Sequence, residues 1–162
     1  MIRDTQLKFS GTIASGNAAT RSGQAITVDA LSTNVIDLRN ASTPTLVDEG
    51  ILGGDLWLVV VALTAAAGGD SAKTLTITLK SDSVATIDSS PTTHYTSDAI
   101  LGSTITAGAT LVRVKLPSGD YERYLGVYYD VSATFTSFTV EAFLTPDVAR
   151  NVIYPSGITI DA

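Results

Sequence analysis

Apolar and polar side chains alternate along much of the chain, and an alternation of period two predicts β-strands. The clearest case is segment 73–80, where Leu75, Ile77 and Leu79 fall on one side and Thr and Lys side chains fall on the other. Leu7, Phe9 and Ile13 predict a similar half-buried strand near the start. Further short strands are predicted over 24–29, 33–38, 110–116, 121–131, 135–144 and near the end of the chain. Since no stretch combines a helix cap with a 3.6-residue period, the pattern predicts an all-β protein.

The segment Leu56–Thr64 differs from the others because both of its alternating sides are apolar. Leu56, Leu58 and Val60 lie on one side, and Trp57, Val59 and Val61 lie on the other. A strand of this kind is covered on both faces. It therefore belongs at a sheet centre or at a subunit contact.

Turn-rich segments divide the strands and set the predicted architecture. Residues 14–23 are rich in Ser, Gly, Ala and Asn and predict a flexible loop, whereas Pro117–Asp120 predicts a turn. The strands predicted over 110–116, 121–131 and 135–144 form a plausible meander. In the polar region 81–103, two short strands are possible around Val84–Ile87 and His94–Ile100.

Eight to ten strands with loops of unequal length favour a β-sandwich of antiparallel sheets, with a jelly roll as the leading topology. We expect one domain over residues 1–162, with an N-terminal arm at about 1–10, the loop at about 14–23 and a C-terminal tail at about 149–162.

Charge and cysteine content exclude several classes of protein. The 162 residues include 16 acidic and 10 basic side chains, a formal net charge of -6, so neither nucleic acid nor an anionic membrane is an expected partner. The longest apolar run, Leu56–Leu63, is far shorter than a membrane-spanning helix. Without cysteine there is no disulfide, thiolate nucleophile or Cys-ligated metal. The first residues do not resemble a signal peptide, so we expect the protein to stay in the compartment where it is made.

Catalytic motifs are weak. The single histidine, His94, has no Gly-x-Ser-x-Gly elbow to accompany it and is expected to be an exposed loop side chain. Asp82, Asp88 and Asp98 share one turn-rich region, where turn chemistry is a better explanation than a calcium site or a glycosidase carboxylate pair. We therefore expect no enzymatic activity, no metal and no cofactor.

Four tyrosines cluster on the strand predicted over 121–131. By alternation Tyr124 and Tyr128 share one face, while Tyr121 and Tyr129 share the other, so at least one pair belongs to the core. The other pair could form a platform for a sugar or for another protein.

Several segments, in order, resemble the capsid cementing proteins of short-tailed bacteriophages. They are Asp4–Leu7, Ser32–Leu38 (Ser-Thr-Asn-Val-Ile-Asp-Leu), Asp55–Val60, Thr74–Leu79 and Arg123–Tyr129 (Arg-Tyr-Leu-Gly-Val-Tyr-Tyr). The second and the last are the most specific. The loop 11–23 and the tail from Ala149 are longer than this family leads us to expect.

The resemblance implies a jelly-roll protein on the outer surface of the virion head, made in the host cytoplasm. It would bridge neighbouring major capsid subunits against the pressure of packaged DNA, acting as a homo-oligomer, dimer or trimer, with no catalytic role. The alternative is a carbohydrate- or receptor-binding β-sandwich module of a virion. Candidate contacts with the capsid or between subunits are Arg3, Lys8, Phe9, Arg21, Trp57, Tyr124 and Tyr128.

Overall fold

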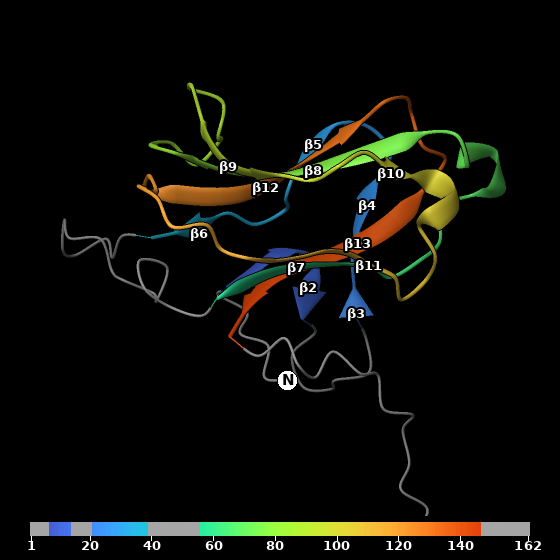
Figure 1. Cartoon of the computed structure of the whole chain (residues 1–162), viewed down its shortest axis with the longest axis horizontal. Helices are drawn as coiled ribbons and strands as arrows, with labels where there is room; N and C mark the ends of the chain where they lie inside the picture. Colours follow the sequence, from blue (N-terminus) through green and yellow to red (C-terminus); the bar gives the residue numbers. More distant parts are fainter. Residues whose placement is uncertain (1–6, 14–20, 39–55, 147–162) are drawn as a thin grey trace, which may run out of the picture.

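Two antiparallel sheets stack face to face in the computed structural model, which describes residues 7–13, 21–38 and 56–146 (Figure 1). The prediction of an all-β sandwich is confirmed. The predicted C-terminal tail, most of the loop 14–23 and the first six residues lie outside the described residues.

The first sheet, called sheet A here, is the lower layer in Figure 1. Its strands are β1 (Lys8–Ser10), β4 (Gln24–Ile26), β7 (Trp57–Ala62), β11 (Thr110–Lys115) and β13 (Phe138–Thr145). Strand β13 pairs with β1, β4 and β7, and β7 also pairs with β11. This order leaves β11 at one edge of the sheet and β1 with β4 at the other.

The second sheet, sheet C, is the upper layer. Its strands are β5 (Ala30–Leu31), β6 (Ile36–Asp37), β8 (Thr74–Asp82), β9 (Thr92–Thr96), β10 (Ile100–Leu101) and β12 (Tyr124–Val131). Strands β8 and β12 pair at the centre, β5 and β6 flank β12, and β9 and β10 flank β8. A separate small ribbon joins β2 (Thr12–Ile13) to β3 (Arg21–Ser22), and two short 3-10 turns cover Gly68–Asp70 and Gly102–Thr104.

The strand order is that of a jelly roll. Three pairs of short strands each share one edge of a longer strand: β1 and β4 lie along β13, β5 and β6 along β12, and β9 and β10 along β8. If each pair is counted as one strand position, every sheet has four positions and the sandwich has eight. Along the chain these positions alternate between the sheets, except that β8 is followed by β9 and β10 in the same sheet. The order is β1 and β4, β13, β7, β11 in sheet A, and β5 and β6, β12, β8, β9 and β10 in sheet C, which is the strand order of an eight-stranded jelly roll.

The core lies between the sheets and follows the predicted alternation. Leu75, Ile77 and Leu79 of β8 are fully buried, as are Leu58 and Val60 of β7. The other inward-facing side chains come mainly from β12 and β13, namely Leu125, Val127, Tyr129, Val140, Ala142 and Leu144. These central strands therefore meet face to face through aliphatic side chains, as two packed sheets require.

Strand β7 also confirms the expectation for a strand with two apolar sides. It lies at the centre of sheet A, between β13 and β11. On the side away from the core, Val59, Val61 and Phe143 form a second buried cluster against which Trp57 packs. Of the two locations predicted for such a strand, the structure shows the sheet centre.

The predicted meander is wrong. Strands β11 and β13 both pair with β7 in sheet A, whereas β12 pairs with β8 in sheet C. Consecutive strands therefore cross between layers instead of pairing with one another. The alternation along each strand was correctly identified, but period two does not select the neighbouring strand.

Two other local expectations are corrected. Val84–Ile87 is not a strand but part of a turn-rich connection, in which Ile87 has a φ of 49°. At the N-terminus, Lys8–Ser10 is not part of an arm because it pairs with β13 as strand β1. The strand predicted from Leu7, Phe9 and Ile13 is broken at Gly11, whose φ of 88° favours glycine.

Candidate interaction surfaces

The four clustered tyrosines divide between core and surface as alternation predicted. Tyr129 is fully buried, and Tyr121 is 7% exposed and donates a hydrogen bond to the Pro117 carbonyl. Tyr124 and Tyr128 are half-buried on the opposite side of β12. This side is the outer face of sheet C, so the candidate contact tyrosines lie on a surface.

Each surface tyrosine carries a cation over its ring. The Arg123 guanidinium lies 4.8 Å from the Tyr124 ring centroid, and the Lys80 ammonium lies 4.5 Å from that of Tyr128. Arg123 also makes a forked contact with Asp37, with Nη2 2.8 Å from Oδ2 and Nε 3.0 Å from Oδ1. The hydrogen bond with Asp37 raises the pKa of Arg123. We call this set of five residues the tyrosine face.

The connection between β8 and β9 places Ile87 between the two tyrosines, over Gly126. Gly126 separates them, and a Cβ added there would lie 2.5 Å from Ile87 Cδ1 and 3.1 Å from Leu31 Cδ1. A side chain at position 126 would therefore have to displace the ends of the Ile87 and Leu31 side chains, and glycine lets the β8–β9 connection lie close to the sheet without that shift. The platform consists of two separate rings with an aliphatic side chain between them.

Asp82 holds that loop in place. Its carboxylate accepts hydrogen bonds from the backbone amides of Ser89, at 2.9 Å, and Val84, at 3.3 Å. Burial raises the pKa of Asp82, but these backbone hydrogen bonds and those from Ser83 outweigh the effect and leave it below its usual value. Turn chemistry is the observed role of this aspartate.

The two most specific segments of the family resemblance form one unit in the fold. Tyr124 and Leu125 pair with Asp37 and Ile36 in adjacent strands. The Ser32 amide donates to the Val127 carbonyl at 2.7 Å, and the Val127 amide donates to the Ser32 hydroxyl at 3.1 Å. Segments 32–38 and 123–129, far apart in the sequence, thus build one side of the tyrosine face together.

Asp37 and Lys80 belong to this surface although the alternation pattern does not identify them as contact residues. Asp37 comes from β6 and Lys80 from β8, so both reach the tyrosines across strand pairs. For Asp37 the sequence offered one signal, because segments 32–38 and 123–129 carry opposite charges at Asp37 and Arg123, whereas nothing in the sequence paired Lys80 with Tyr128.

The other predicted contact residues lie elsewhere. Lys8 and Phe9 are 4% and 0% exposed, with Lys8 Nζ 3.0 Å from Glu141 Oε1, so neither offers a contact on the described surface. Pairing of β1 with β13 buries them, which corrects the expectation of an exposed arm. Trp57 is half-buried on the outer face of sheet A. Arg21 lies in β3, and Arg3 lies outside the described residues.

His94 is neither in a loop nor fully exposed. It lies in β9, its Nε2 is 2.7 Å from the Ser81 hydroxyl, and its ring stacks on Tyr121 with centroids 4.0 Å apart. Burial lowers the pKa of His94, and the nearby Glu122 carboxylate partly opposes that effect. Ser81 is fully buried and also accepts a hydrogen bond from the Glu122 amide, which makes this pair a packing contact.

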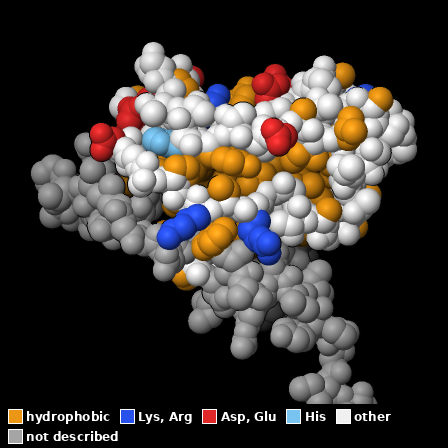
Figure 2. Space-filling model, in the orientation of Figure 1, with side chains coloured by type: hydrophobic (Ala, Val, Ile, Leu, Met, Phe, Trp, Pro, Cys, Tyr) orange, Lys and Arg blue, Asp and Glu red, His pale blue; other side chains and the backbone are white. Residues whose placement is uncertain are grey.

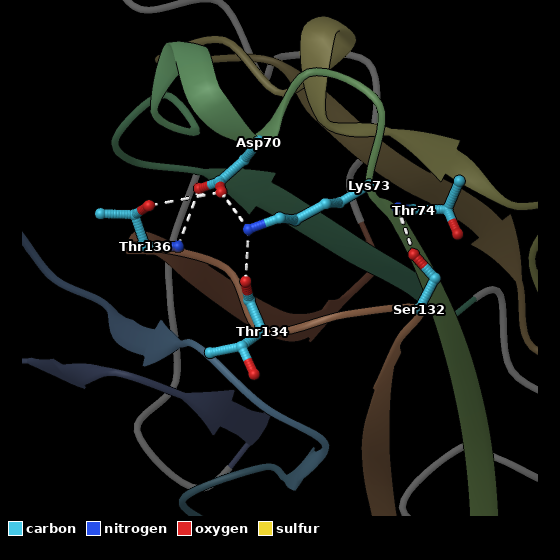
Figure 3. A network of polar contacts seen from close by, with 6 residues as sticks. All are labelled: Asp70, Lys73, Thr74, Ser132, Thr134 and Thr136. Carbon is cyan, nitrogen blue, oxygen red and sulfur yellow. Dashed lines mark hydrogen bonds and ion pairs between the residues drawn. The ribbon is translucent and has the colours of Figure 1, made fainter.

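A polar network at one end of the sandwich ties its loops together (Figure 3). Asp70 is fully buried, contacts Lys73 Nζ at 2.6 Å and accepts a 2.8 Å hydrogen bond from the Thr136 amide. Lys73 also donates to the Thr134 carbonyl. The hydrogen bond from Lys73 is the main cause that lowers the pKa of Asp70. The network therefore joins the β7–β8 connection to the β12–β13 connection.

Within ranges 7–13, 21–38 and 56–146, no group of three or more metal-ligating side chains is present, and no helix is long and apolar enough to cross a membrane.

The strand order and the core define a β-sandwich protein of the jelly-roll class. The chain belongs to the Bbp16 family, whose model matches residues 20–144. A search of curated proteins finds no match.

Proposed function

We propose that this protein is a structural component of a bacteriophage virion, which binds the outer surface of the icosahedral head and cements neighbouring major capsid subunits. The observation that carries the proposal is the joining of segments 32–38 and 123–129, the most specific parts of the resemblance to capsid cementing proteins, into one surface-forming unit.

The tyrosine face is the capsid contact in this proposal. Tyrosine and arginine are the residue types most often found among the energetically dominant positions of protein interfaces. Strand pairing and the Arg123–Asp37 contact hold Tyr124 in place before any partner arrives, and the Lys80 contact does the same for Tyr128. Pre-organised side chains lose less conformational entropy on binding.

Cementing follows from engaging several capsid subunits at once. A homo-oligomer presents one tyrosine face per subunit, so a second contact forms at the high effective concentration set by the first. Contacts that are weak singly then hold the shell together. The rigid sandwich transmits tension between its contacts because packed interiors have low compressibility.

Co-sedimentation with empty expanded shells of the corresponding major capsid protein tests the proposal. The wild-type chain should pellet with shells, and the double variant Tyr124→Ala/Tyr128→Ala should bind at least about tenfold more weakly, the effect of losing interface hot spots. The matched control Tyr124→Phe/Tyr128→Phe keeps both rings and should bind nearly as well. As a second control, Val28→Ala changes a side chain that is 52% exposed in the connection between β4 and β5, outside the tyrosine face, and this variant should bind shells as the wild type does.

Absence of wild-type binding to shells would remove the proposal. Binding that survives the double alanine change would move the capsid contact away from the tyrosine face. A glycan array on the same variants tests the carbohydrate-binding alternative, because sugar binding lost in Tyr124→Ala/Tyr128→Ala would favour that reading instead.

A further inference from the structure

The connection between β8 and β9, residues 83–91, has a single buried side chain, and we call this connection the strap. In Figure 1 it stands in yellow-green on the outer side of sheet C, next to β9. From position 83 to position 90 every side chain is exposed except that of Ile87, which is 6% exposed. Figure 2 shows mainly uncharged polar atoms where the strap stands, whereas hydrophobic atoms gather in a band between the two layers. Ile87 is therefore the apolar anchor of the strap.

The anchor fills the centre of the tyrosine face. Tyr124, Gly126 and Tyr128 project from the same side of β12, because they alternate along one strand. A Cβ added at Gly126 would lie 2.5 Å from Ile87 Cδ1 and 3.1 Å from Leu31 Cδ1, so the end of Ile87 lies directly over the glycine. The space between the two rings thus fits an aliphatic side chain, and in the free protein the chain supplies that side chain itself.

The backbone of the strap is strained where it places this anchor. Within ranges 7–13, 21–38 and 56–146, two residues other than glycine have a positive φ, Ile87 at 49° and Ser90 at 73°, and both belong to the strap. This region is particularly unfavourable for a β-branched residue such as isoleucine. The strain of such a residue and the gain from burying one aliphatic side chain are of the same order. Closing the strap through Ile87 therefore stabilises the protein little.

The polar attachment of the strap can be exchanged for water. Asp82 is fully buried beneath the strap and accepts hydrogen bonds from the amides of Ser89, at 2.9 Å, and Val84, at 3.3 Å. When the strap lifts, water reaches the carboxylate and both amides, so these hydrogen bonds are replaced and not simply lost. Neither attachment opposes opening strongly.

We propose that the strap is an autoinhibitory latch on the tyrosine face, and that an aliphatic side chain of the major capsid protein displaces Ile87 when the shell is bound. The incoming side chain packs on Gly126 and Leu31 between the two tyrosine rings, in the space that Ile87 occupies in the free protein. The inference rests on the proposed function and names the chemistry at the centre of the capsid contact.

Such a latch makes binding selective for assembled shells. When only a minor fraction of the protein is open, the apparent affinity of one contact falls by that fraction. Several contacts made together overcome this loss, whereas a single free capsid subunit does not.

Removing the anchor tests the latch through a gain of binding. Ile87→Gly empties the space over Gly126, and glycine adopts a φ of 49° without strain. In co-sedimentation with empty expanded shells this variant should bind at least about tenfold more tightly than the wild type, a gain that misfolding does not produce. The matched control Ala85→Gly adds the same backbone freedom at an exposed position of the strap and should bind as the wild type does. Unchanged or weaker binding by Ile87→Gly would overturn the inference.

A reversible lock tests the opening itself. The chain has no cysteine, so Ile87→Cys/Gly126→Cys introduces one pair, at positions close enough for a disulfide across the tyrosine face. The oxidised protein should bind shells at least about tenfold more weakly than the same protein after reduction, and the two single cysteine variants should not respond to the reductant. Equal binding by the oxidised and reduced forms would show that the strap does not have to open.

Hydrogen exchange of the free wild-type protein tests the strap without shells. The Ser89 amide, bound to Asp82, should exchange through local opening at least about a hundredfold faster than the amides of the central pair β8 and β12. Exchange at the same rate as the central pair would overturn the latch even if the wild type pellets with shells. A wild type that does not pellet, with Ser89 exchanging locally, would instead remove the cementing function and the capsid side chain while keeping an opening strap.

Discussion

The two long edges of the sandwich hold the two sheets together in different ways. At one edge, called the closed edge, β1 and β4 face β5 and β6, and at the other, called the open edge, β11 faces β9 and β10. At the closed edge, Gln24 of sheet A donates to the Leu31 carbonyl of sheet C at 2.8 Å and accepts hydrogen bonds from Ser10 and from the Thr33 amide, each at 2.8 Å. The Ser10 hydroxyl also lies 2.7 Å from the Tyr129 hydroxyl, which joins β1 to β12. Polar bridges and fully buried side chains hold this edge together.

At the open edge the facing side chains are apolar and half-buried. The chain crosses the closed edge directly, between β4 and β5, whereas it reaches β11 from β10 around one end of the sandwich. The comparison teaches that buried side chains and polar bridges close one edge, whereas partly exposed apolar side chains line the other. Substitutions at the closed edge should therefore cost more stability than substitutions of exposed side chains at the open edge.

The largest expected effect is at Phe9. Phe9→Ala removes a fully buried ring from the closed edge and should lower the free energy of unfolding by about 3–5 kcal/mol. Leu101→Ala, at a side chain that is 47% exposed beside the open edge, should change it by less than about 0.5 kcal/mol. Urea denaturation measures both, and equal effects would erase the distinction between the edges.

The next effect is at Gln24. Gln24→Ala removes the hydrogen bonds that Gln24 makes with the Leu31 carbonyl, the Ser10 hydroxyl and the Thr33 amide, and should cost about 1–3 kcal/mol of stability. Thr110→Ala, at an exposed position of β11, is the control and should be close to neutral. A neutral Gln24→Ala would show that packing alone closes this edge.

A matched pair of tyrosines sharpens the comparison further. Tyr129→Phe removes the fully buried hydroxyl that contacts Ser10, and should cost about 1 kcal/mol. Tyr121→Phe removes a hydroxyl bound to Pro117 near the open edge, where water can replace it, so the loss should be smaller. Thermal unfolding of the two variants measures both losses of stability. A larger loss for Tyr121→Phe than for Tyr129→Phe would contradict the prediction.

The smallest effect concerns pH. Burial lowers the pKa of His94 in the folded protein below the ordinary histidine value of about 6.5. Below a pH of about 6.5 the unfolded chain therefore binds more protons at His94 than the folded protein does. The free energy of unfolding decreases as the pH falls from there towards the pKa of His94 in the folded protein. His94→Gln should flatten the stability profile in that window while leaving the loss near the pKa of the carboxylates. A profile that is unchanged by the substitution would remove His94 as its cause.

The sequence predicted the faces of the strands well. Period two assigned Leu75, Ile77 and Leu79 to the core, and it separated Tyr121 and Tyr129 from Tyr124 and Tyr128. It also identified the doubly apolar β7. These features depend on the local backbone, in which successive side chains point to opposite faces whichever strands lie alongside.

The sequence did not predict which side chains contact one another across strands. The contacts of Arg123 with Asp37, of Lys80 with Tyr128 and of His94 with Ser81 all join separate strands or hairpin partners. The failed meander has the same origin, because adjacent segments in the chain can pair or cross to the opposite sheet with an identical alternation.

By itself, then, the sequence determined the all-β class, the inward and outward faces, and the charge and apolar groups available to each strand. Only the tertiary structure decided the jelly-roll order, the buried position of Lys8, the assembly of the tyrosine face and the difference between the two edges. The physical reason is that alternation is set within a strand, whereas pairing is selected by the packing of two whole sheets and by where the chain crosses between them.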